Sequence, residues 1–213
     1  MNWLLNTLGT SIGKKLMMAV TGLSFIGFLV VHLAGNMTLY GGESMFNGYA
    51  EHIHGYGPLI NAAEFVLLTL ALIHITVGMV LFYQNLTSRP SRYQASRWAG
   101  GRTVGSATMP YTGILILAFL ILHLLSFRFI DLEHTTIYDV VVSVFADPLY
   151  VVIYIAAMAI VALHISHGFW SLFQTLGANH PKYMPTIQVV GLAVSLIFGI
   201  GFGFIPVYIS FMA

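Results

Sequence analysis

The chain has 213 residues, of which 58% are hydrophobic and only 7% charged. Soluble domains carry about 25% charged residues, so this composition excludes a soluble domain. The net charge of +1 indicates no nucleic-acid partner, and the lack of cysteine excludes disulfides, Cys-ligated iron–sulfur clusters and covalently attached c-type haem. Any metal chemistry must therefore use histidine, methionine or carboxylates.

In chain order, residues 1–13 are apolar but short, and with Trp3 they are typical of a helix lying at a membrane interface. No signal peptide is expected, because the next apolar run follows Lys14 and Lys15 and continues past signal length without a cleavage site. Five long stretches without charged residues follow, and a membrane span needs ~20 apolar residues. We expect five transmembrane helices, near residues 14–39, 60–86, 107–129, 148–175 and 186–211. The chain is thus predicted to be one all-α integral membrane domain over residues 1–213, without internal repeats.

The distribution of charges predicts the orientation of this five-helix bundle. Under a five-span arrangement, seven of the eight basic residues lie on one side: Lys14, Lys15, Arg89, Arg92, Arg97, Arg102 and Lys182. Arg128 lies on the other side, together with nearly all the acids. By the positive-inside rule the N-terminus is cytoplasmic and the C-terminus is on the outer side of the cytoplasmic membrane.

Five of the nine histidines fall inside the predicted spans: His32, His74, His123, His164 and His167. The helical rise of 1.5 Å per residue sorts four of them into two depths. His32 and His123 belong to an outer level, and His74 and His164 to an inner one. His167 lies one turn beyond His164 and is turned by about 60° from it, so we interpret it as a neighbour of the inner site or of a haem propionate.

Two imidazoles facing each other from different helices satisfy a six-coordinate haem iron, so two levels predict two non-covalent b haems. Gly35, Gly78 and Gly168 follow three of these histidines by three or four positions, which would leave room for a flat macrocycle. A single intramembrane histidine often only bonds a neighbouring helix. A metal or proton transporter is the competing use of such histidines, but it would want carboxylates among them, and Glu64 alone qualifies.

Four segments together resemble a known family: Phe28-Leu-Val-Val-His32-Leu-Ala-Gly-Asn36, Leu72-Ile-His74-Ile-Thr-Val-Gly78, Leu120-Ile-Leu-His123 and His164-Ile-Ser-His-Gly-Phe-Trp170. In this order on successive helices, they resemble the diheme cytochrome b membrane subunit of the succinate dehydrogenase and quinol:fumarate reductase complexes. The resemblance is to the five-helix, single-polypeptide type and covers essentially the whole chain.

The resemblance implies that His32 and His123 are axial ligands of an outer haem, and His74 and His164 those of an inner haem. It also implies two soluble partners on the cytoplasmic face, a flavoprotein with FAD and an iron–sulfur protein, and it is compatible with a dimer of the whole complex in the lipid membrane. The Arg-rich segment 89–102 is a candidate for their docking site, although positive-inside topology alone would also explain it.

The implied reaction passes electrons between the iron–sulfur protein and a membrane quinone. In the diheme type this quinone is commonly menaquinone. Quinone chemistry moves protons as well as electrons, and Glu64 is our first candidate for the proton group. Weaker candidates are Asn36, His52, His54 and Arg128. Some relatives carry a glutamate two residues before the fourth ligand, where this chain has Ala162. The alternative function is the cytochrome b anchor of another respiratory dehydrogenase, such as a hydrogenase or formate dehydrogenase.

Overall fold

The computed structural model describes residues 2–88 and 103–212, and in those residues every regular element is a helix. Five helices are long and apolar enough to cross a membrane, as predicted. They are α2 (Ser11–Asn36), α4 (Pro58–Thr87), α5 (Val104–Phe127), α7 (Pro148–Thr175) and α8 (Met184–Met212). The predicted N-terminal helix is α1 (Asn2–Gly9), which precedes α2 directly.

The beginnings of the long helices follow from local sequence. Thr10 caps α2 by accepting a hydrogen bond from the Gly13 amide, which satisfies one of the free N–H groups of the first turn. Thr103 and Ser106 form a reciprocal capping box at the start of α5. At α7, Asp147 caps the helix and Pro148 occupies its first position, where a missing N–H costs nothing.

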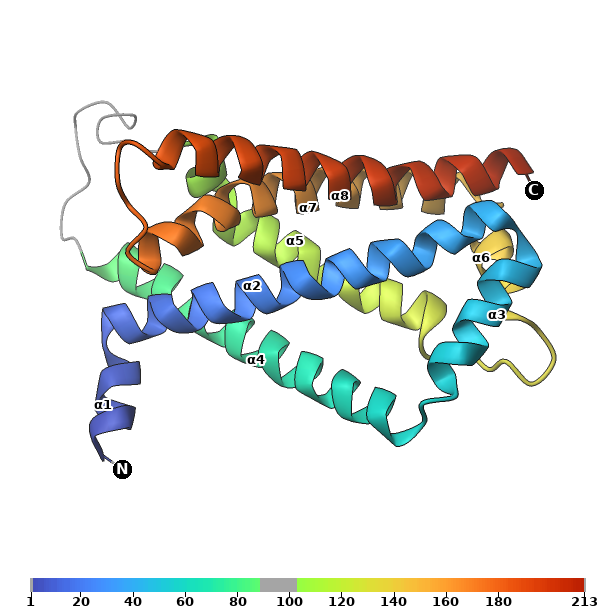
Figure 1. The fold of residues 1–213 in the computed structure, drawn as a ribbon, viewed down its shortest axis with the longest axis horizontal. Coiled ribbons are helices and arrows are strands. Elements are labelled where there is room, and N and C mark those ends of the chain that lie inside the picture. Colours follow the sequence, from blue (N-terminus) through green and yellow to red (C-terminus); the bar gives the residue numbers. More distant parts are fainter. Residues whose placement is uncertain (1, 89–102, 213) are drawn as a thin grey trace.

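The long helices run alternately up and down between two ends of a bundle, which we name the α1 end and the α3/α6 end (Figure 1). At the α1 end, the start of α2 meets the end of α4 through a hydrogen bond from Lys14 Nζ to Gln84 Oε1 of 3.0 Å. At the α3/α6 end, the end of α5 meets the start of α4 through Arg128 and Glu64. Consequently α2 and α5 run in one direction, and α4 and α7 in the other.

Two connections at the α3/α6 end contain short helices that the sequence analysis did not predict. These are α3 (Glu43–His54), which follows the 3-10 turn Met37–Gly41, and α6 (Ile137–Phe145). They meet where the amide of Tyr138 donates to Asn47 Oδ1 at 3.1 Å. A buried apolar core fills this end of the bundle: Leu39, Phe46, Val141, Phe145, Tyr154, Ile205 and Ile209.

The long helices present large apolar side chains outward along their length. Phe65 on α4 and Ile200 on α8 are 68% and 67% exposed, and none of the residues of α4 is buried. Water would penalise so much apolar surface, whereas hydrocarbon would not. The surface therefore fits a lipid environment. The Arg-rich segment 89–102, the predicted docking site, lies outside the described residues.

Candidate cofactor site at two levels of the bundle

The histidine pair nearer the α3/α6 end is formed by His32 of α2 and His123 of α5. Their ring centres lie 5.9 Å apart with the ring planes at 86°. Each ring packs on the phenylalanine four residues before it: Phe28 stacks on His32 at 5.2 Å, and Phe119 lies 5.8 Å from His123. Phe202 of α8 closes the pair from a third side, 5.5 Å from His32. The pair thus lies within an aromatic shell.

The distance between these two rings fits two ligands of one metal ion. Metal–nitrogen bonds of about 2 Å on opposite sides of one ion put two imidazole centres roughly 6 Å apart. The same spacing also suits an ordinary edge-to-face contact. A hydrogen bond of 3.4 Å joins Nδ1 of His123 to the hydroxyl of Tyr154, which leaves Nε2 of that ring for another partner.

The second pair, His74 of α4 and His164 of α7, lies nearer the α1 end and has a different arrangement. Nδ1 of His74 is 2.8 Å from the hydroxyl of Thr21 on α2. Nδ1 of His164 is 3.0 Å from the hydroxyl of Thr112 on α5. In each ring Nδ1 therefore contacts a threonine hydroxyl, and within residues 2–88 and 103–212 no hydrogen bond reaches Nε2.

The two levels are separated along the bundle by a fixed length of helix. His32 follows Thr21 by eleven residues on α2, and His123 follows Thr112 by eleven residues on α5. At 1.5 Å per residue, this spacing separates the levels by about 16 Å along the helix axes. The structure thus brings the rings of His32 and His123 together and places His74 and His164 at a second level, while the role of all four as haem ligands stays a prediction.

The glycines that were expected to make room for a macrocycle differ in their surroundings. At Gly35 a Cβ atom would lie 2.6 Å from the ring of Tyr49, so this glycine accommodates a side chain of α3 and the expectation for it was wrong. At Gly78 the nearest atom is 3.5 Å away, in Met18, and at Gly168 nothing lies within 4 Å. A side chain at Gly168, four residues after His164, would therefore meet no neighbouring atom.

His167 faces the N-terminus of α5 rather than the centre of the bundle. Its Nδ1 lies 3.4 Å from the hydroxyl of Thr103, and its ring packs edge-on against Trp170 at 4.7 Å. A Cβ at Gly105 would lie only 2.7 Å from the Cβ of His167, so α5 crosses α7 closely at this point. His167 thus lies beside the inner pair, one turn toward the α1 end.

Glu64 forms a two-pronged ion pair with Arg128. The Nε atom of Arg128 donates to Oε1 of Glu64 at 2.8 Å, and its NH2 group donates to Oε2 at 2.9 Å. The side chains are 43% and 50% exposed, respectively. The hydrogen bond and charge of Glu64 raise the pKa of the Arg128 guanidinium, so the Arg128 side chain stays cationic. Sequence reasoning named both residues separately and missed their pairing.

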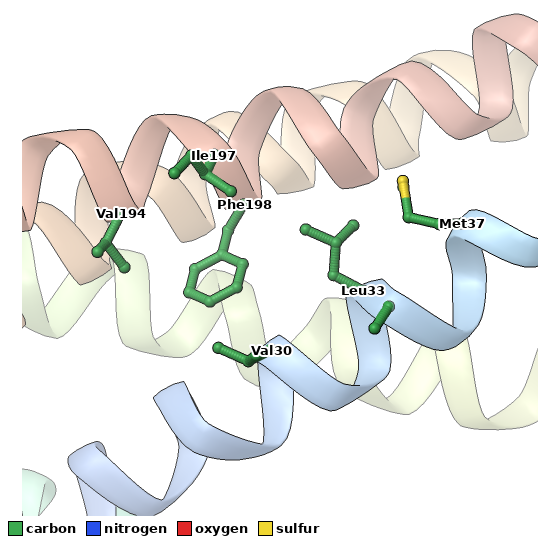
Figure 2. A pocket seen from close by; sticks show the side chains of 7 residues that line it. Val30, Leu33, Met37, Val194, Ile197 and Phe198 are labelled. Carbon is green, nitrogen blue, oxygen red and sulfur yellow. The ribbon is translucent and has the colours of Figure 1, made fainter.

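An open apolar groove of ≈ 310 Å³ lies between α2 and α8, beside the level of His32. Figure 2 shows labelled side chains from these two helices and from Met37, the first residue of the 3-10 turn after α2, with Phe198 and Leu33 reaching across from opposite sides. Every lining residue is apolar: Val30, Leu33, Ala34, Met37, Val194, Ile197 and Phe198. The groove therefore offers a hydrocarbon chain contact area but offers no hydrogen bond to a polar headgroup.

The donor set of the paired histidines fits haem better than a free metal ion. In the described residues, no group of three or more His, Cys, Asp or Glu side chains comes together to hold an ion. A porphyrin supplies four nitrogen ligands to its iron, so the protein would have to supply only two more. Two histidines per level are sufficient for haem, whereas a bare cation would usually need three or more protein ligands.

Comparison of the chain with protein-family models, curated proteins and solved structures gives no match.

Proposed function

We propose that the protein is the diheme cytochrome b subunit of a succinate:quinone oxidoreductase, anchored in the cytoplasmic membrane. The observation that supports this most directly is the ring contact between His32 of α2 and His123 of α5, together with a second level where His74 and His164 each contact a threonine of another helix. The order of the four motifs along the chain links the pairing to the succinate dehydrogenase and quinol:fumarate reductase family.

In this proposal His32 and His123 hold one b haem, and His74 and His164 hold the other. When bound there, the haems would supply one-electron transfer along the bundle between the iron–sulfur partner and the membrane quinone. Two histidines at each haem would leave the iron no position for oxygen or substrate. The aromatic shell of Phe28, Phe119 and Phe202 keeps water from the first pair.

The side on which the soluble partners bind follows from the predicted orientation. With the N-terminus in the cytoplasm, the α1 end faces the flavoprotein and the iron–sulfur protein, and the level of His74 and His164 lies nearer to them. The α3/α6 end then faces outward and carries Glu64. Its carboxylate is charged beside Arg128, so Glu64 would take up a quinone proton only when this ion pair opens.

The test is a reduced-minus-oxidised spectrum of the purified protein, with His164→Ala and His167→Ala as matched variants one turn apart. We expect two b-type haems per chain, loss of one in His164→Ala, and retention of both in His167→Ala. A chain without b-type bands would refute the proposal and favour a transporter. Loss of haem in His167→Ala alone would move the ligand by one turn. Copurification with a hydrogenase or formate dehydrogenase, in place of a fumarate-reducing partner, would favour the alternative anchor.

A further inference from the structure

The two histidine–threonine hydrogen bonds reveal an internal repeat in the fold. Thr21 bonds a histidine 53 residues later, and Thr112 bonds a histidine 52 residues later. The elements between them also match, since each unit is a long helix, a short helix and a second long helix. The first unit is α2, α3 and α4, and the second is α5, α6 and α7, with α8 outside the repeat. The sequence analysis did not recognise this correspondence.

The sequence agrees with this register. Residues 21–36 and 112–127 share six of sixteen positions, which include the Thr-Gly pair, Phe28 with Phe119, and His32 with His123. Residues 58–87 and 148–177 share seven of thirty: the Pro-Leu start, the His-Ile pair, a glycine four residues after the histidine, and a later glutamine and leucine. Parallel repeats of this weak similarity are known in membrane bundles. Each proposed ligand pair thus consists of equivalent residues from the two units.

A Thr-Gly dipeptide, Thr21-Gly22 in the first unit and Thr112-Gly113 in the second, contacts a histidine ring in the same way in both units. A Cβ at Gly22 would lie 3.7 Å from Cε1 of His74, and a Cβ at Gly113 would lie 3.7 Å from Cε1 of His164. These are ordinary van der Waals distances, so each glycine lies directly beside the ring. The preceding threonine then reaches Nδ1 of the same ring, and both threonines are buried, at 3% and 5% exposure.

The hydrogen-bond partners of each threonine indicate which atom carries the proton. The Thr21 hydroxyl donates to the carbonyl of Met17 at 2.7 Å, and the Thr112 hydroxyl has the carbonyls of Thr108 and Met109 at 3.1 Å. A hydroxyl has one hydrogen, and a carbonyl can only accept. When the hydroxyl hydrogen goes to its own helix, its oxygen accepts from Nδ1–H of the histidine. The lone pair then lies on Nε2, which is the form that ligates a metal.

We propose that Thr21 and Thr112 are positioning residues that hold His74 and His164 in the Nδ1–H form, with Nε2 free for one haem iron. The inference rests on the proposed haem function and adds to it a pair of residues that no ligand motif contains. The other level lacks this device: the hydroxyl near His123 belongs to Tyr154, at 3.4 Å. Removing a threonine hydroxyl should therefore change one haem and leave the other unchanged.

The experiment compares Thr21→Val and Thr112→Val with Thr21→Ser and Thr112→Ser in the haem-loaded protein. Valine keeps the shape and removes the hydroxyl, whereas serine keeps the hydroxyl. Thr69→Val is the matched control, because the Thr69 hydroxyl bonds only its own helix, at the carbonyl of Phe65, and is exposed. The measurements are redox titration of each haem band and the g-values of each ferric low-spin signal. The haem that is lost in His164→Ala identifies the inner signal.

In each valine variant we expect the midpoint potential of the inner haem to rise, because an imidazole without its acceptor is less basic and stabilises ferric iron less. A severalfold increase in its reduced-to-oxidised ratio at fixed potential, with altered inner g-values, would support the inference. Loss of the inner haem in the valine variants alone would also support it. The serine variants and Thr69→Val should match the wild type.

Unchanged potential and g-values in both valine variants, with two haems retained, would overturn the role of the threonines and leave the proposed function intact. Loss of haem in the serine variants as well would also overturn it, because the hydroxyl would not be the group required. A wild-type chain without haem would instead refute the proposed function itself.

Discussion

At the scale of single residues, Glu64 is the one acidic side chain within the five long helices. In the register of the repeat, it corresponds to Tyr154 of the second unit. The two have different partners: Tyr154 contacts His123, whereas Glu64 pairs with Arg128. Because both charges are about half exposed, their mutual attraction is screened and the pair contributes little to stability, on the order of 0–1 kcal/mol.

We predict that Glu64→Gln changes the free energy of unfolding by less than ~1 kcal/mol and leaves both haem bands intact. If Glu64 is the quinone proton group, the same variant should slow quinone-linked turnover by ~10²-fold or more. The control is Glu51→Gln, which removes an exposed acid on α3. It should leave turnover, stability and both haem bands unchanged. Full turnover in Glu64→Gln would reject the proton role and leave the residue as half of a surface ion pair.

At the scale of elements, α8 packs tightly against α7 at two of its glycines. A Cβ at Gly199 would lie 2.9 Å from the Cβ of Ala162, and one at Gly191 would lie 2.9 Å from the ring of Phe169. Small residues at such crossings let helix backbones pack in lipid, where the hydrophobic effect does not drive helices together. The repeat provides the four histidine-bearing helices, and α8 covers one side of them through these glycines.

A large side chain at Gly199 should separate α8 from α7. We predict that Gly199→Leu destabilises the protein by roughly 1–3 kcal/mol, the usual cost of overpacking. Gly27→Leu is the control, because nothing lies within 4 Å of a Cβ at that exposed helical position, and leucine favours helix over glycine. Thermal unfolding in detergent would measure both. Equal midpoints for the two variants would show that α8 tolerates separation from α7.

At the scale of the whole molecule, five membrane spans would place the two termini on opposite sides of the membrane. The α1 end carries the N-terminus and the end of α4, and the α3/α6 end carries both short helices and the C-terminus (Figure 1). The distribution of basic residues predicts that the α1 end faces the cytoplasm. In the proposed function, this orientation would place the level of His74 and His164 nearer to the soluble partners.

The lack of cysteine makes the orientation directly measurable, because each introduced cysteine is unique in the chain. We predict that an impermeant maleimide labels Glu51→Cys and Ser210→Cys on intact cells, and labels Asn6→Cys only after the membrane is permeabilised. All three positions are exposed. The reversed pattern would invert the bundle, and labelling of Asn6 and Ser210 from one side would contradict five spans.

The sequence by itself determined the number and approximate bounds of the long helices and the depth of each intramembrane histidine. Both properties depend only on the order of residues along each helix. Hydropathy sets which segments enter lipid, and the constant helical rise converts residue number into depth. The predicted span 148–175 coincides with α7, and the levels of His32 with His123 and of His74 with His164 follow from counting along their helices.

Only the tertiary structure decided what each side chain faces. It filled the space beside Gly35 with Tyr49, paired Glu64 with Arg128, placed Thr21 and Thr112 on the inner histidines, and folded α3 and α6 in the connections. These contacts depend on how each helix is rotated and which helix lies beside it. Rotation and neighbours are set by packing between residues far apart in the chain, which the periodicity of a single helix does not encode.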